Sequence, residues 1–200
     1  MKLLKLSSSL LFLGMTSLSS MAQKIKLIEG DLAPLKGETS IMVKFTYDHM
    51  RVGKFDKEED YVAKKTADYN KKEPGRGDNW AKSWASDRER MFEPKFIELF
   101  EKESEMTASV KSPAKYTLIF KTIFTEPGYN VPMITHENAR IDAEVWIVET
   151  AGEKVIAKIS VEKAPGRSYG GSDYDTGVRI AEAYADAGKY LGKFIKKSGK

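Results

Sequence analysis

Residues 140–161, RIDAEVWIVETAGEKVIAKISV, carry the clearest structural signal in the chain. Apolar side chains alternate with other residues on both sides of a short link, TAGE at residues 150–153. The apolar positions are Ile141, Ala143, Val145 and Ile147 before the link and Val155, Ala157, Ile159 and Val161 after it. A period of two is typical of a strand that buries one face. The short glycine-containing link predicts that the two strands form an antiparallel hairpin.

Two earlier segments show the same alternation and predict further strands of this sheet. Residues 41–47 place Ile41, Val43, Phe45 and Tyr47 on one face, and residues 116–124 do the same with Tyr116, Leu118, Phe120, Thr122 and Phe124. Residues 23–29 predict one more strand, at the edge of the sheet. Since each strand has one strongly apolar face, we expect the sheet to be covered on one side.

Helices are predicted between the first strand and the later ones. The first covers residues 57–72, with Asp56 as its cap and Glu59 completing a capping-box-like pair. The second begins after Asp78, which we expect to cap it. Pro94 interrupts this helix, so we expect either a kink or a new helix with Pro94 in its first turn.

A closing helix is predicted for residues 176–197. Its apolar side carries Ile180, Tyr184, Ala187, Leu191 and Phe194. Small residues flank that side, including Gly188 and Gly192, so we expect the helix to lie close to a partner element, for which the sheet is the natural choice.

The order of elements is strand, two helices, three strands and a long helix, without a low-complexity linker. This order predicts an α+β fold, a two-layer sandwich with a mainly antiparallel sheet of four to five strands and helices packed on one face. Residues 23–200 are expected to form a single domain.

Residues 1–22 are predicted to be a cleavable signal peptide. Lys2 and Lys5 precede an apolar stretch, residues 6–18, that is too short to span a bilayer. Ser20 and Ala22 then form the small-residue pattern that precedes a cleavage site. We therefore expect export, a periplasmic or secreted location, and Gln23 as the new N-terminus.

Composition excludes several classes of protein. The chain has 200 residues and no cysteine, so disulfides, thiolate zinc sites and thiol catalysis are excluded. Its net charge is only +4, and two of its basic residues lie in the predicted signal peptide, so nucleic acid is not an expected partner. Beyond the signal peptide no apolar run approaches the length of a transmembrane segment. We predict no cofactor.

One resemblance to known proteins emerges from three parts of the chain. Residues 173–193, with DTGVRI followed by AYADAGK, resemble the closing helix of small exported bacterial envelope proteins of the domain-of-unknown-function type. The turn at residues 126–128 and the helix with Trp80 and Trp84 are similar to the same group. The resemblance implies a fold similar to an anticodon-binding domain or to the N-terminal domain of TolB, and an envelope location. It implies no activity.

Local motifs offer few candidates for chemistry. His49 and His136 each stand beside a carboxylate, and a two-histidine, one-carboxylate site would require their strands to be neighbours. No helical ligand spacing supports it, so we predict no metal site. The glycine-rich residues 165–172 lack the lysine of a phosphate-binding loop and are interpreted as a connection. The tripeptide at residues 76–78, RGD, is interpreted as a chance occurrence.

Catalysis has equally little support. With two histidines and no serine motif, a catalytic triad is not expected, and we predict no catalytic residue. A pair of carboxylates remains an alternative, because any two acidic residues can meet in the fold. Trp80 and Trp84 lie one helical turn apart, and packing in the core is the preferred interpretation over a platform for ligands.

The second face of the sheet is the predicted binding surface. It carries Met42, Ile119, Ile123, Trp146 and Ile156 among charged residues, which is more apolar than a face in plain contact with water. The alternative is that the N-terminal segment or the first helix covers this face. The leading hypothesis is a non-catalytic envelope module that binds a protein or a cell-surface component. The bound protein can be a second copy of this chain, which would make a homo-oligomer. The alternative function is a carboxylate-dependent hydrolase acting on envelope polymers.

Overall fold

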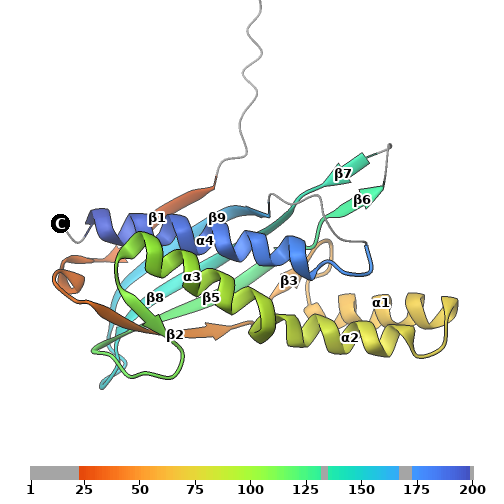
Figure 1. Ribbon diagram of the computed structural model, residues 1–200, viewed down its shortest axis with the longest axis horizontal. Helices are drawn as coiled ribbons and strands as arrows, with labels where there is room; N and C mark the ends of the chain where they lie inside the picture. Colours follow the sequence, from red (N-terminus) through yellow and green to blue (C-terminus); the bar gives the residue numbers. More distant parts are fainter. Residues whose placement is uncertain (1–22, 132–134, 167–172, 199–200) are drawn as a thin grey trace, which may run out of the picture.

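A sheet of seven strands forms one layer of the molecule (Figure 1). The computed structural model describes residues 23–131, 135–166 and 173–198. The strand order is β1-β9-β8-β5-β2-β4, and β3 also pairs with β5. The strands are β1 (Lys24–Gly30), β2 (Ser40–Thr46), β3 (Arg51–Val52), β4 (Thr107–Ser109), β5 (Tyr116–Glu126), β8 (Ala139–Glu149) and β9 (Val155–Gly166). A separate two-stranded ribbon consists of β6 (Tyr129–Val131) and β7 (Thr135–Glu137).

The sheet is antiparallel on one side and parallel on the other. Strands β1, β9, β8 and β5 are antiparallel, which confirms the hairpin across residues 150–153 and the edge position of the first strand. Strands β2 and β4 continue the sheet in parallel. The sequence predicted four to five strands because β3 and β4 have only two and three residues, too few to show an alternation.

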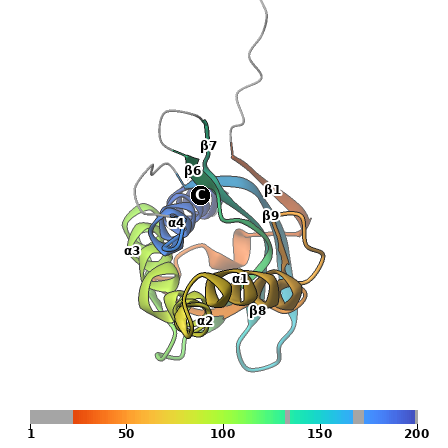
Figure 2. The same ribbon diagram turned by 90° about the vertical axis from the view of Figure 1, so that its right-hand side faces the viewer.

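Helices form the second layer on one face of the sheet (Figure 2), which confirms the α+β class. The helices are α1 (Glu58–Lys72), α2 (Arg76–Asp87), α3 (Glu93–Ser104) and α4 (Gly177–Ser198), with a short 3-10 turn η1 (Ala33–Leu35) before β2. The core between the layers includes fully buried Phe96, Phe100, Leu118, Phe120, Val145, Ile159, Ile180 and Leu191. All of them except Phe96 and Phe100 are positions that the periodicity described above assigned to the apolar faces.

Helix α4 packs tightly against α3, as well as against the sheet. A Cβ atom on Gly188 would lie 2.3 Å from the carbonyl oxygen of Phe96, and one on Gly192 would lie 2.8 Å from that of Phe100. The small residues of α4 therefore serve a helix–helix contact. The sequence had pointed to the sheet as the partner, because a periodicity within one helix does not identify the neighbour it serves.

The two expected helix caps are not formed. Helix α1 begins at Glu58, after an N-cap Lys57 that makes no side-chain bond, and Asp56 lies outside it. Helix α2 begins at Arg76 after Gly75, so Asp78 lies within its first turn. Its indole side chains, Trp80 and Trp84, are buried with Tyr61 and Tyr69 between α1 and α2, in agreement with the core interpretation.

A π-helical turn, η2 (Arg88–Phe92), joins α2 to α3. Pro94 then occupies the first turn of α3, which confirms the alternative of a new helix at that proline. The wider turn of a π-helix changes the direction of side chains relative to a regular α-helix, and such turns recur at functional sites. In this molecule it places Arg88 beside the end of β2.

Candidate functional site

The face of the sheet opposite α3 and α4 is open to solvent. Lys44, Glu144 and Ile123 are exposed on it, and Met42 and Trp146 are partly exposed. Strand β1 extends the edge of the sheet beside β9, and α1 lies next to β3. Figures 1 and 2 show α3 and α4 on the other side.

Trp146 lies near the middle of this face. It stands directly across from Ile119 of β5 and from Lys158 of β9. Ile119 in turn pairs with Lys44 of β2. The register therefore places one row of side chains across four strands, with the aromatic ring between an isoleucine and a lysine.

Charged groups surround the indole of Trp146. The Nζ atom of Lys121 is 3.3 Å from a ring centroid of the indole, and that of Lys158 is 5.0 Å away. Cations over an aromatic ring are attracted by its quadrupole. The indole Nε1 donates to Oε2 of Glu144 at 3.3 Å, and Lys158 also binds Glu29 at 2.7 Å. The ring is held in place while part of it stays accessible.

The five predicted binding residues do not form one cluster. Trp146 and Ile123 line the same groove, and Ile119 adjoins Trp146. Met42 lies on β2, two strands away from Trp146. Ile156 lies beside a register shift between β8 and β9 and packs partly against the core. The sequence pattern assigned these residues to one face, but only the register decides which of them are neighbours.

The groove beside Trp146 has a volume of about 470 Å³. Ile28 and Ile123 provide its apolar surface together with the indole, and its acidic residues are Glu29, Asp142, Glu144 and Glu162. Ile28 is the most exposed large apolar side chain of the described chain, at 63%. No periodicity or motif in the sequence distinguishes Ile28 from its neighbours.

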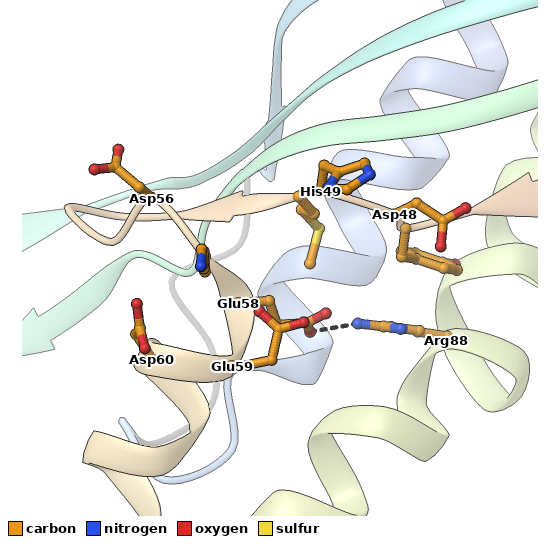
Figure 3. Close-up of a pocket in the computed structure, with 10 residues that line it drawn as sticks. Asp48, His49, Asp56, Glu58, Glu59, Asp60 and Arg88 are labelled. Carbon is orange, nitrogen blue, oxygen red and sulfur yellow. Dashed lines mark hydrogen bonds and ion pairs between the residues drawn. The ribbon is translucent and has the colours of Figure 1, made fainter.

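A larger groove of about 810 Å³ lies between the end of β2 and the start of α1 (Figure 3). No motif in the sequence predicts this groove. Five carboxylates line it together with His49, Lys57 and Arg88; these are Asp48, Asp56, Glu58, Glu59 and Asp60. Figure 3 shows Glu58 reaching toward Arg88, with Asp56 and Asp60 on the opposite side of the groove. The four acidic residues within positions 56–60 were visible in the sequence, but their position opposite Arg88 depends on the fold.

The innermost polar groups of this larger groove are engaged with one another. Arg88 forms an ion pair with Glu58, and its guanidinium carbon lies 4.0 Å from the ring centroid of Tyr47. The same Oε1 of Glu58 also accepts a hydrogen bond from Nε1 of Trp84. The Glu58 side chain therefore links the start of α1 to α2 and to the π-helical turn.

Behind Arg88, a tyrosine and a glutamate form a second polar contact. The hydroxyl of Tyr47 donates to Oε1 of Glu93 at 3.1 Å. Burial raises the pKa of Tyr47, and the nearby Tyr184 and Glu93 raise it further. Burial also raises the pKa of Glu93, although the bond from Tyr47 works against this shift.

The two histidines are far from the arrangement that a shared metal ion needs. His49 lies between β2 and β3, and His136 lies on β7 of the separate ribbon. Strand β5 separates β2 from β8, so these two strands are not neighbours. Across the described ranges, no three histidine or acidic side chains gather as ligands for a metal.

The remaining motifs also have structural explanations where they can be seen. Residues 76–78 form the first turn of α2: the Arg76 carbonyl accepts from the Tyr174 hydroxyl, and the Gly77 N–H donates to Asn70. The connection at residues 165–172 lies mostly outside the described residues, as does the predicted signal peptide at residues 1–22. No described helix has both the length and the apolar character to cross a membrane.

Comparisons with known proteins give weak structural matches only. The sequence matches no family model and no curated protein. A PelC dodecamer from Paraburkholderia phytofirmans is similar at 10% identity and a TM-score of 0.37, covering 82% of this chain and 96% of that one. A DUF330 protein from Xanthomonas campestris is similar at 15% identity and a TM-score of 0.37, covering 54% of this chain and 61% of that one.

The structural matches thus include a DUF330 protein. Identities of 10 and 15% and TM-scores of 0.37 do not establish a family, an assembly or a function for this chain.

Proposed function

We propose that this chain is a non-catalytic envelope module, exported through its N-terminal signal peptide, that binds a protein or a cell-surface component on the open face of its sheet. The observation that carries the proposal is the position of Trp146. A tryptophan buries a large apolar area when it packs. Here it lies partly exposed in the middle of a sheet face, beside exposed Ile123 and Ile28.

The energetics favour a partner for this face. Transfer of apolar surface out of water is favourable by roughly 25 cal/mol per Å². An apolar patch with a charged rim is typical of an interaction site on a soluble protein. The open face has this composition, since Ile28, Ile123 and Trp146 lie among Lys44, Lys121, Glu144 and Lys158.

The alternative, hydrolysis by a pair of carboxylates, has one observation in its favour, which is the larger acidic groove. A general acid must be able to take up and release a proton next to its substrate. The most enclosed carboxylate of that groove, Glu58, is bound by both Arg88 and Trp84. For this reason we prefer the binding module.

A substitution on the open face tests the proposal. Trp146→Glu introduces a charge into the apolar patch, and Tyr190→Glu, at an exposed position of α4, is the matched control. We expect Trp146→Glu to fold, as judged by its thermal melt, and to lose capture of an envelope component or self-association in sedimentation. Tyr190→Glu should retain both. If Trp146→Glu unfolds the protein, Trp146 belongs to a second core and the proposal is wrong.

Export is tested separately. N-terminal sequencing of the protein from the periplasm or medium of its host should begin at Gln23. An intact Met1 in the cytoplasm would contradict export and leave the binding surface to be judged by the Trp146 variants.

A further inference from the structure

Gln23, the residue before β1, carries a side-chain amide with no hydrogen-bond partner. Its Nε2 and Oε1 atoms are both buried, and neither is bonded to any of the described residues. The great majority of buried polar groups in proteins are paired, and an unpaired one costs roughly 1–3 kcal/mol. An amide with both atoms unpaired therefore needs an explanation, and the position of Gln23 in the chain supplies one.

Gln23 becomes the first residue of the chain when the predicted signal peptide is removed. Ser20 and Ala22 form the small-residue pattern before the predicted cut. Hydrolysis of the bond between Ala22 and Gln23 would release the α-amino group of Gln23. An α-amino group titrates close to physiological pH, so part of it is in the neutral form that acts as a nucleophile.

The released amine and the side-chain amide of the same residue can react with each other. The amine nitrogen attacks Cδ, the new N–Cδ bond closes a five-membered lactam, and the bond between Cδ and Nε2 breaks. Nε2 leaves as ammonia and takes up the proton that the amine loses. One amide replaces another without oxidation or reduction, so no cofactor or co-reactant is needed. Because both groups belong to one residue, the attack is intramolecular, which raises its rate strongly.

The structure leaves the Gln23 amide free for this ring closure. A side chain that is hydrogen-bonded to its surroundings must break those bonds before it can fold back onto its own amine. The amide of Gln23 has no such bond to a described residue. The register of β1 with β9 begins at Lys24, which stands across from Glu162, so Gln23 precedes the first paired residue. Ring closure therefore disturbs neither a side-chain bond nor the printed strand pairing, and it eliminates the unpaired Nε2 donor.

A lactam at Gln23 would protect the strand that follows it. In the described sheet, β1 is an edge strand whose one partner is β9. Fraying and proteolysis concentrate at chain ends of this kind. An aminopeptidase recognises a free α-amine, and the lactam removes both that amine and its charge. The protected strand carries Ile28, which lies at a register shift between Leu27 and Glu29 and lines the groove beside Trp146.

We propose that Gln23 is a modification site, at which the side chain cyclises onto its own α-amine after removal of residues 1–22. The mature chain then begins with pyroglutamate, and this end group shields β1 from aminopeptidases. The proposal rests on the export part of the proposed function, because only cleavage before Gln23 releases the amine.

Mass spectrometry of the protein exported by its host tests the modification, since a pyroglutamyl end has no amine for stepwise chemical sequencing. Cleavage after glutamate releases residues 23–29, QKIKLIE, as the N-terminal peptide. We expect most of this peptide to be lighter than its sequence by one molecule of ammonia. An isotope-labelled synthetic QKIKLIE, carried through the same digestion, measures the cyclisation caused by handling and should stay largely open.

Gln23→Asn is the matched variant for the protective effect. It keeps a side-chain amide, but its ring would be one atom smaller and too strained to form. We expect an aminopeptidase to trim exported Gln23→Asn at least about tenfold faster than the exported wild type. Prior treatment of the wild type with a pyroglutamyl peptidase, which removes the lactam residue, should make it as sensitive as the variant. Thermal melts of both proteins should coincide, so that trimming reports the end group and not a loss of fold.

The outcomes separate this proposal from the proposed function. A peptide that begins at residue 23 with an open glutamine would overturn the modification and leave export standing. Equal loss of ammonia from the synthetic peptide would also overturn it, because handling would then account for the lactam. Equal trimming of wild type and Gln23→Asn would overturn the protection of β1. A chain that begins at any other residue would contradict cleavage before Gln23 and the modification with it, and an intact Met1 would contradict export as well.

Discussion

Gly188 of α4 lies directly against the backbone carbonyl oxygen of Phe96 in α3, where a Cβ atom would approach to 2.3 Å. A backbone oxygen inside a helix cannot move aside as the end of a side chain can. Gly188→Ala should therefore force the two helices apart and destabilise the protein by about 1–3 kcal/mol. Chemical unfolding measures this, with Gly152→Ala as the control, since a Cβ at Gly152 meets nothing within 4 Å. Equal stability of both variants would contradict the close helix contact.

Leu191, one turn before Phe194 on α4, is completely buried. Leu191→Ala removes part of its side chain and leaves a cavity between the layers, so we expect a loss of about 2–5 kcal/mol in the free energy of unfolding. The neighbouring Tyr190 is 38% exposed, and Tyr190→Ala should cost far less. A melt of Leu191→Ala that matches wild type would show that α4 is peripheral to the core.

Arg179 is a buried cation that ties α4 to the turn at residues 126–128. It donates to the carbonyl oxygens of Pro127 and Gly128 at 3.4 and 3.3 Å, and it pairs with Asp173 at 3.3 Å. Arg179→Met leaves the buried carbonyl acceptors without their donor, and we expect a loss of about 1–3 kcal/mol. Urea unfolding of this variant is best compared with Arg76→Met, a half-exposed site, which should lose much less.

The pH dependence of stability should report on Glu93. Burial raises its pKa in the folded protein, so the folded state holds this proton more tightly than the unfolded chain. The carboxyl therefore contributes stability below its unfolded pKa, and that contribution is lost as the pH rises through its folded pKa. Glu93→Gln keeps an acceptor for Tyr47 and removes the titration. We expect Glu93→Gln to gain stability relative to wild type as the pH rises from about 3 to about 7.

Unfolding curves at several pH values measure the Glu93→Gln effect. Glu98→Gln on the exposed side of α3 is the control, and it should show no such trend. A stability difference for Glu93→Gln that stays constant with pH would contradict the burial of this carboxyl.

Several features of the site could not be predicted from the sequence, and the reason is the same for each. The apolar faces of residues 41–47 and 116–122 follow from local periodicity, and the structure buries them wholly or in part. The prediction was wrong for Phe124, because Ile123 is an extra residue in β5 and Phe124 therefore stands across from Asp142 on the other face. A bulge, by contrast, is a mismatch between two paired strands, and neither strand shows it alone. Ile28 therefore looked like part of an ordinary edge strand until its pairing with β9 was known.

The larger groove gives a second example. Four acidic residues lie within positions 56–60 of the sequence, but Arg88 meets Glu58 only because a π-helical turn redirects the chain after α2. The expected caps Asp56 and Asp78 were also wrong, because α1 begins after Lys57 and α2 begins after Gly75. The preference of a single residue for the cap position does not by itself fix where a helix begins.

By itself, the sequence determined the elements whose signal is local. Alternation gave the long strands and the hairpin at residues 140–161, and helical spacing gave α4, because burial of one face imposes a period on each element separately. The tertiary structure decided everything that depends on two elements meeting. The parallel placement of β2, the α3 contact of Gly188, and the gathering of Ile28, Ile123 and Trp146 around one groove depend on register and packing between distant segments.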